Sequence, residues 1–166
     1  MLVVIGGLPA TGKTALARLP AAKIGAVHVR VDTIEQALVR SGPARHPVGP
    51  AGYVVGSAEE QLRQGLSVIA EPVNPPAVTR GARRDAAVRA GVPWVEVEVV
   101  CSDPAEQRRR VASRSVDIPG LPLPDWEEVV GRQYEPWNRE RIVVDTAGTA
   151  PEESPAALVR AITVNS

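Results

Sequence analysis

The stretch LVVIGGLPATGKT, residues 2–14, decides the fold of this 166-residue chain. Its first part, Leu2–Gly6, is a continuous apolar run of the kind found in strands that are covered on both faces. Its second part, from Gly7 to Thr14, matches the pattern G-x4-G-K-[ST], and residues compatible with a helix follow it. The pattern therefore lies between a strand and a helix, which is the context that its chemistry requires.

Glycines in such a loop let the backbone curl until successive N–H groups and the helix N-terminus point at phosphate oxygens. The predicted phosphate-binding residues are Gly7, Leu8, Pro9, Ala10, Thr11, Gly12, Lys13 and Thr14. Lys13 adds a charge at the β- and γ-phosphates, and Thr14 offers a hydroxyl to Mg²⁺. A chance glycine-rich turn is the alternative, and the complete match in this context disfavours it.

The composition favours one soluble globular domain over residues 1–166, since 44% of the residues are hydrophobic and 23% are charged. Zero net charge leaves no overall field to attract a membrane surface or long nucleic acid. The first apolar run is too short for a signal peptide or a membrane span, and the lone Cys101 cannot form an internal disulfide. We therefore expect a cytoplasmic protein.

Five short apolar runs alternate with segments of helical character, which predicts a parallel sheet covered by helices. The predicted strands are Leu2–Gly6, Val27–Asp32, Leu66–Ala70, Trp94–Val100 and Arg141–Asp145. The second strand alternates valine with polar residues, so we place it near an edge of the sheet.

Proline and acidic residues predict where helices start and stop. The predicted starts are Asp103-Pro104, for a helix through about Ser113, then Asp125-Trp126 and Ser154-Pro155. Pro20 should kink or end the helix that follows the phosphate loop. The Gly- and Pro-rich stretches Ser41–Gly52 and Ile118–Pro124 are predicted to be loops, and the second could belong to a lid.

This order of elements resembles that of small P-loop kinases, a group that includes chloramphenicol phosphotransferase, gluconate kinase, zeta toxins and the kinase domain of polynucleotide kinase. Beyond the phosphate loop, the resemblance rests on Asp32, Glu71, Arg110 and Arg114. It implies the three-layer α/β/α P-loop NTPase fold, with a five-stranded parallel sheet in the order 2-3-1-4-5. It also implies a lid, over about residues 103–139, that closes over ATP.

Two carboxylates close predicted strands at the edge where the phosphate loop lies. We predict that Asp32 is the catalytic base that accepts the proton of the acceptor hydroxyl, the role of the matching aspartate in that group. The alternative is an N-cap for a helix that starts near Thr33. Glu71 stands where P-loop proteins usually place an aspartate that holds Mg²⁺ through water. The longer side chain is a departure, and a structural carboxylate is the alternative.

Arginines provide the other candidate side chains. Arg110 and Arg114 are one helical turn apart, so both could face the nucleotide and offset charge on the transferred phosphoryl group. Arg80 is the arginine nearest the end of the third strand, and it is a further catalytic candidate against a solvated surface. The turn Asp145–Gly148 resembles the one that borders adenine in that group.

These features predict an ATP- and Mg²⁺-dependent kinase that phosphorylates a hydroxyl of a small molecule, such as an antibiotic, a sugar or a nucleoside. One alternative is a regulatory ATPase that acts on a protein partner. Another is a kinase of nucleotides or polynucleotide ends, although no aromatic-interleaved basic groove favours long nucleic acid. We expect the acceptor along Thr33–Gly65, while its identity and the oligomeric state stay open.

Overall fold

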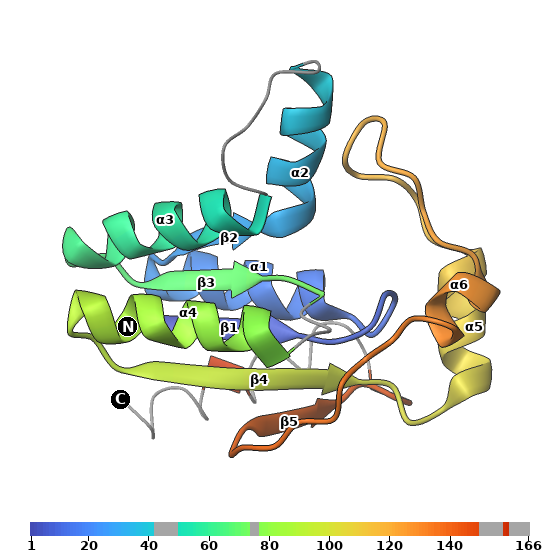
Figure 1. Ribbon diagram of the computed structural model, residues 1–166. Helices are drawn as coiled ribbons and strands as arrows, with labels where there is room; N and C mark the ends of the chain where they lie inside the picture. The colour runs from blue at the N-terminus through green and yellow to red at the C-terminus, as the bar shows by residue number, and fades with distance from the viewer. Residues whose placement is uncertain (42–49, 74–76, 150–157, 160–166) are drawn as a thin grey trace.

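The computed structural model describes residues 1–41, 50–73, 77–149 and 158–159. Five strands form one sheet with helices on both faces (Figure 1). The strands are β1 (Leu2–Gly6), β2 (Val27–Arg30), β3 (Val68–Glu71), β4 (Trp94–Val100) and β5 (Ile142–Asp145). They are parallel and lie in the order β2-β3-β1-β4-β5. The predicted order and the edge position of the second strand are therefore confirmed.

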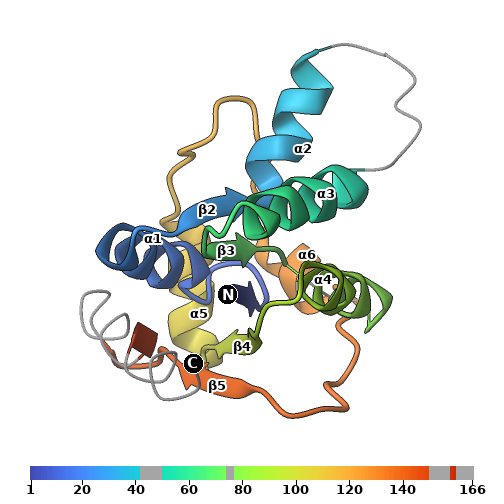
Figure 2. The same ribbon diagram turned by 90° about the vertical axis from the view of Figure 1, so that its left-hand side faces the viewer.

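The helices connect the strands and make the outer layers of the fold. They are α1 (Lys13–Ile24), α2 (Val31–Arg40), α3 (Pro50–Arg63), α4 (Ala77–Ala90), α5 (Pro104–Ala112) and α6 (Trp126–Val130). Figure 2, which looks along the strands, shows α1 on one face of the sheet and α3 and α4 on the other. The predicted three-layer architecture is confirmed. No helix in the described part of the chain has the length and apolar composition needed to cross a membrane.

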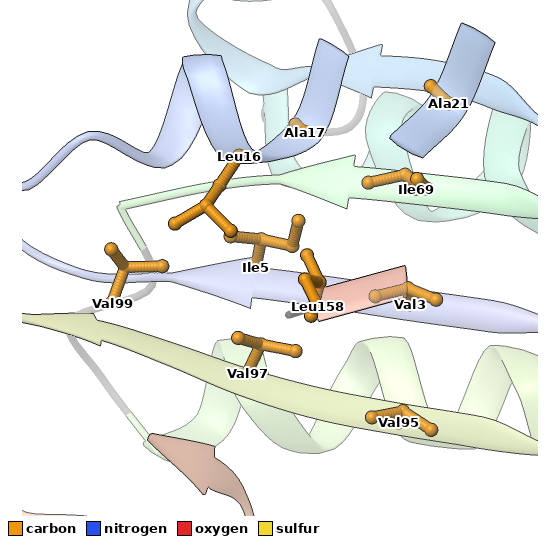
Figure 3. Packing of buried hydrophobic residues seen from close by; sticks show 10 residues of the cluster. All are labelled: Val3, Ile5, Leu16, Ala17, Ala21, Ile69, Val95, Val97, Val99 and Leu158. Atoms are coloured by element: carbon orange, nitrogen blue, oxygen red, sulfur yellow. The ribbon is translucent and has the colours of Figure 1, made fainter. Parts of the chain in front are cut away.

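Strand β1 lies at the centre of the core because both of its faces are covered. Val3 and Ile5 pack with Leu16 and Ala17 of α1 (Figure 3). The alternate residues of β1 point to the opposite face, where they join a second buried cluster with residues of α3 and α4. This double burial explains why the run Leu2–Gly6 is apolar at every position.

The predicted second strand is two residues too long. The ladder ends at Arg30, and α2 begins at Val31, so Asp32 lies in the first turn of this helix. Arg30 occupies the N-cap position, which also excludes the predicted N-cap role of Asp32. The alternating pattern misled the strand prediction because Val31 is buried by helix packing and not by strand pairing.

Helix α1 does not end at Pro20 but continues to Ile24. Pro20 lies on the buried face of the helix, where packing against the sheet offsets the lost backbone hydrogen bond. Helix α3 starts at Pro50, inside the stretch Ser41–Gly52 that the sequence predicted to be a loop. Residues 42–49 of that stretch and the predicted helix start Ser154-Pro155 lie outside the described residues.

Candidate active site

The loop between β1 and α1 is a tight curl that only glycine can complete at its start. Gly7 has a φ of 150°, and a Cβ there would lie 2.3 Å from the carbonyl oxygen of Val99 on β4. Gly12 has a φ of 94°, and Ala10 has a φ of 62°, the one positive φ of a non-glycine residue in the described ranges. Strained backbone of this kind is typical of functional loops and fits a concave phosphate-binding loop.

Distant segments hold the loop in this shape. The side chain of Gln107, on α5, donates a hydrogen bond to the carbonyl of Pro9 at 2.9 Å. Thr146, just after β5, donates from its hydroxyl to the carbonyl of Thr11, also at 2.9 Å. Sequence reasoning missed Gln107, because a glutamine in a row of arginines carries no signal of its own. The loop is thus preorganised by α5 and by the turn after β5.

Lys13 is buried at the start of α1, and its Nζ donates to the carbonyl of Leu8 at 2.8 Å. Burial lowers the pKa of Lys13 to about 8. The carboxylates of Glu71 and Asp32 oppose this shift, while the charges of Arg114 and Arg132 add to it. The ammonium group of Lys13 is therefore desolvated and its charge is only partly compensated. An anionic phosphate would supply the missing negative charge.

Glu71, at the end of β3, links several polar groups beside Lys13. Its side chain is 4% exposed, and it accepts hydrogen bonds from Thr14 at 2.5 Å and, at its other oxygen, from His28 at 3.0 Å. Burial raises the pKa of Glu71, but the hydrogen bonds and the charges of Lys13 and Arg30 outweigh it, so the pKa is held below its usual value.

Thr14 and Glu71 form a donor set that fits Mg²⁺. A hydroxyl and an ionised carboxylate are the oxygen ligands that this ion prefers, and it usually completes its shell with substrate phosphates and water. In the part of the chain that the structure describes, no three His, Cys, Asp or Glu residues come together as a metal site. Thr14 and Glu71 would thus hold Mg²⁺ only together with phosphate. The contact with His28 orients Glu71.

Three cavities in the described part of the chain lie beside the loop or Asp32. The first, of about 430 Å³, lies between α1, α5 and the turn after β5, and is lined by Gly12, Ala15, Leu16, Glu106, Arg110, Ser113, Thr146 and Thr149. The second, of about 250 Å³, is lined mainly by the loop together with Asp32, Glu71, Arg110 and Arg114. The third, of about 390 Å³, lies beyond Asp32 and is lined by residues of α2, α4 and the segment 114–132.

Shared lining residues join the cavities in a row. Arg110 lines the first and the second, and Asp32 and Arg114 line the second and the third. A nucleotide with its base in the first cavity would thus place its phosphates in the second. Thr146, in the turn predicted to border adenine, lies in the first cavity.

The two predicted lid arginines take different positions. Arg110 donates to the hydroxyl and the carbonyl of Thr146 at 2.8 and 2.7 Å, and pairs with Glu106 at 2.5 Å. Arg114 does not share the helix face of Arg110, because α5 ends at Ala112 and Ser113 is its C-cap. The turn that follows brings Arg114 to the boundary of the second and third cavities.

The structure does not bring Arg80 to these cavities. Its side chain is fully buried, and its guanidinium donates to the carbonyls of Glu135 and Pro136 at 3.2 Å. It also lies 4.7 Å from the centre of the Trp137 ring, within the range of a cation–π contact. Arg80 thus anchors the segment 135–137, and the arginine of α4 that reaches the site is Arg83.

The third cavity takes little of its lining from Thr33–Gly65, the range in which the sequence predicts the acceptor. Among the described residues of that range, only Glu35 lines the third cavity. The other walls come from α4, from the end of β3 and from the segment 114–132. These segments lie far apart in the sequence and meet only in the folded chain.

Comparison with protein families matches residues 2–129 to AAA_33, an AAA domain. Among solved structures, a candidate kinase from Chloroflexus aurantiacus j-10-fl is 19% identical, with a TM-score of 0.73, 99% of this chain and 97% of that chain covered. A gluconokinase from Sinorhizobium meliloti 1021 is 15% identical, with a TM-score of 0.63 and coverage of 99% and 96%.

A third structure, the Mycobacterium tuberculosis APS kinase CysC in complex with AMPPNP and APS, is 16% identical, with a TM-score of 0.61 and coverage of 98% and 96%. No protein with a curated description matches the chain. At these identities the likeness shows the fold alone, which is that of the P-loop NTPases.

Proposed function

This chain belongs to the AAA_33 family of AAA domains, and we propose that it is an ATP-dependent kinase that phosphorylates a hydroxyl group of a small molecule. The observation that carries the proposal is the position of Asp32, which lines both the cavity of the phosphate loop and the cavity beyond it. A carboxylate that lies between a phosphate site and a second cavity is placed for proton transfer between two bound reactants.

The reaction assigns one role to each side chain at this boundary. Asp32 accepts the proton of the acceptor hydroxyl while the oxygen of that hydroxyl forms a bond to the γ-phosphorus. The bond between the γ-phosphorus and the β,γ-bridging oxygen breaks at the same time. Lys13 and Arg114 stabilise the charge on the phosphoryl oxygens, and Arg110 binds the nucleotide. Mg²⁺, held by Thr14 and by Glu71 through water, would neutralise phosphate charge. We place this chemistry in the cytoplasm, where ATP is abundant.

The similar structures support the proposal because kinases of small molecules are among them. One of them is a gluconokinase, and another is an APS kinase whose structure holds AMPPNP and APS. The regulatory ATPase remains the alternative function. In that case the cavity beyond Asp32 would have no reacting occupant.

The test uses the purified chain with γ-labelled ATP, Mg²⁺ and a panel of sugars, sugar acids, nucleosides and hydroxylated antibiotics. We expect label to appear on one class of acceptor. Asp32→Asn should lower this transfer about 10²- to 10⁴-fold while the affinity for ATP is kept. Asp85→Asn, on the exposed side of α4, is the matched control and should leave transfer unchanged. Release of label only to water, unaffected by Asp32→Asn, would favour the regulatory ATPase.

A further inference from the structure

We propose that the acceptor carries an oxyanion, a carboxylate or a phosphate, and that Arg83 and Arg132 bind this group in the third cavity. The inference rests on the proposed function and narrows its substrate class. It places the hydroxyl of the acceptor at Asp32 and its anionic group at the two arginines. Neutral sugars, neutral nucleosides and uncharged antibiotics would then be poor acceptors.

The position of Arg83 is the first argument. Its side chain is 5% exposed, and it lines the third cavity. Burial therefore removes most of the water around the guanidinium. Its Nη1 donates to the carbonyl of Thr79 at 2.8 Å, one turn earlier in α4, which fixes the direction of the side chain. A guanidinium held in this way is preorganised for a planar oxyanion.

The balance of charge in the cavity is the second argument. Three arginines line it, Arg83, Arg114 and Arg132, against two carboxylates, Asp32 and Glu35. Burial lowers the pKa of Arg83 to about 10, and the nearby charge of Glu35 opposes this shift only in part. An anion that enters the site would add a favourable charge interaction with this buried cation.

The two carboxylates do not form a site for a cationic acceptor. Asp32 lies at the boundary with the phosphate loop, where the hydroxyl must react. Burial and the neighbouring charge of Asp32 raise the pKa of Glu35, which disfavours its ionised form. Arg132 lines the third cavity, and its charge acts on both Glu35 and Lys13.

The remaining wall of the cavity is apolar and sets the size of the occupant. It is formed by the segment Leu121, Pro122, Leu123 and Pro124, together with Val31 and Val73. A volume of about 390 Å³ is near the lower end of small-molecule sites. The cavity thus fits one small molecule with a carbon skeleton against the proline-rich segment and an anionic end at the arginines.

The experiment compares matched acceptors that differ only in the anion. The pairs are D-gluconate with D-sorbitol, glucose 6-phosphate with glucose, and 5′-AMP with adenosine, and they separate carboxylate from phosphate. Binding is measured by thermal shift and calorimetry with AMPPNP and Mg²⁺ at saturation, and transfer is measured with labelled ATP. We expect at least one anionic member to bind and to react, and its neutral partner to do neither.

Three variants test the residues with opposite signs of effect. Arg83→Gln and Arg132→Gln should each raise the KM of the anionic acceptor, about 30-fold or more for the buried Arg83, with the KM of ATP unchanged. Glu35→Gln removes a neighbouring negative charge and should lower that KM. Arg132 is exposed, so its variant keeps the test valid if Arg83→Gln does not fold.

The failures of the two proposals are distinguishable. Phosphorylation of neutral acceptors only, or a lower affinity for the acceptor after Glu35→Gln, overturns the anion site and leaves the kinase intact. Anion binding that is lost in Arg83→Gln and Arg132→Gln, without transfer to any acceptor, supports the anion site and overturns the kinase. Absence of binding by every anionic member overturns the inference whether or not ATP is hydrolysed.

Discussion

The nucleotide side of the site is made largely of consecutive residues, whereas the proposed acceptor side, the third cavity, is assembled from segments that lie far apart in the chain. Residues 7–14 form the phosphate loop, and α5 and the turn after β5 support it. The third cavity takes its walls from α2, α4 and the segment 114–132. Figure 1 shows the loop between α5 and α6 reaching toward α2.

This difference separates what is common to a fold from what is particular to one chain. The phosphate loop presents backbone N–H groups together with the side chains of Lys13 and Thr14, an arrangement that the eight-residue pattern fixes in any chain that carries it. In the third cavity the groups that would bind a ligand are side chains. Replacing one arginine or carboxylate therefore changes which ligands can bind there. We therefore expect mutations on the nucleotide side to affect every acceptor equally, and mutations on the acceptor side to discriminate among acceptors.

Among the variants that test this comparison, Lys13→Gln should have the largest effect. It removes the buried charge nearest the transferred phosphoryl group, and kcat should fall about 10²- to 10³-fold. Steady-state kinetics with two different acceptors checks this, because the loss should be the same for both. A loss confined to one acceptor would contradict the separation of the two sides.

Arg114 and Arg110 locate the boundary between the sides. Arg114→Gln should lower kcat about 10- to 100-fold with little change in the KM of ATP, since a charged hydrogen bond to the transferred group is lost. Arg110→Gln is its matched control and should act mainly on the KM of ATP, because Arg110 lines the first two cavities. If both variants changed kcat and the KM of ATP to the same extent, the two arginines would not mark a boundary between the two sides.

The affinity for ATP should depend on the charge of Lys13. The pKa of this lysine is about 8 in the free protein because of burial, and a bound triphosphate raises it. The complex then keeps a proton that the free protein loses, so affinity is complete below pH 8 and falls as pH rises. Calorimetry with AMPPNP should give a Kd about tenfold weaker at pH 9 than at pH 7.

Lys13→Arg is the control for this pH dependence, because a guanidinium stays charged over the whole range. The variant should show no loss of affinity between pH 7 and pH 9. A wild-type protein whose affinity for AMPPNP is the same at both values would contradict the low pKa of Lys13.

The smallest effect concerns the loop between α5 and α6. Asp117 accepts hydrogen bonds from Arg30 and Arg18, both at 2.7 Å, and so ties this loop to β2 and α1. Arg30 is 7% exposed and Arg18 is 57% exposed. Asp117→Asn should lower the free energy of unfolding by about 1 kcal/mol, a modest value because Asp117 is itself 39% exposed.

Denaturant unfolding measures this change, and Arg18→Gln is the control that should have almost no effect. The hydrogen bond from Arg30 holds the pKa of Asp117 below its ordinary value of 3.8. The stabilisation is therefore present at neutral pH and is lost as the pH falls below that value. If Arg18→Gln lowered the free energy of unfolding as much as Asp117→Asn, the exposed Arg18–Asp117 pair and not the Arg30–Asp117 pair would hold the loop.

The resemblance to small P-loop kinases gave the order of the sheet correctly, and the sequence pattern placed the second strand near the edge. These predictions succeeded because they depend on patterns within short segments, such as the apolar run of β1 and the glycines that follow it. The end of the second strand was wrong, because burial of Val31 does not reveal whether a strand or a helix buries it. Of the two outcomes predicted at Pro20, the end of the helix was wrong, since packing outweighed local preference, and a kink stays a prediction.

The phosphate loop can be predicted from the sequence alone, because eight adjacent residues carry both the backbone freedom and the charge that phosphate needs. Only the tertiary structure decided which arginines take part. Arg80 and Arg83 are three residues apart on α4, yet one is sealed under the segment 135–137 and the other lines the third cavity. The direction of a side chain in a helix and the segment packed against it are set by long-range contacts, and no local pattern encodes them.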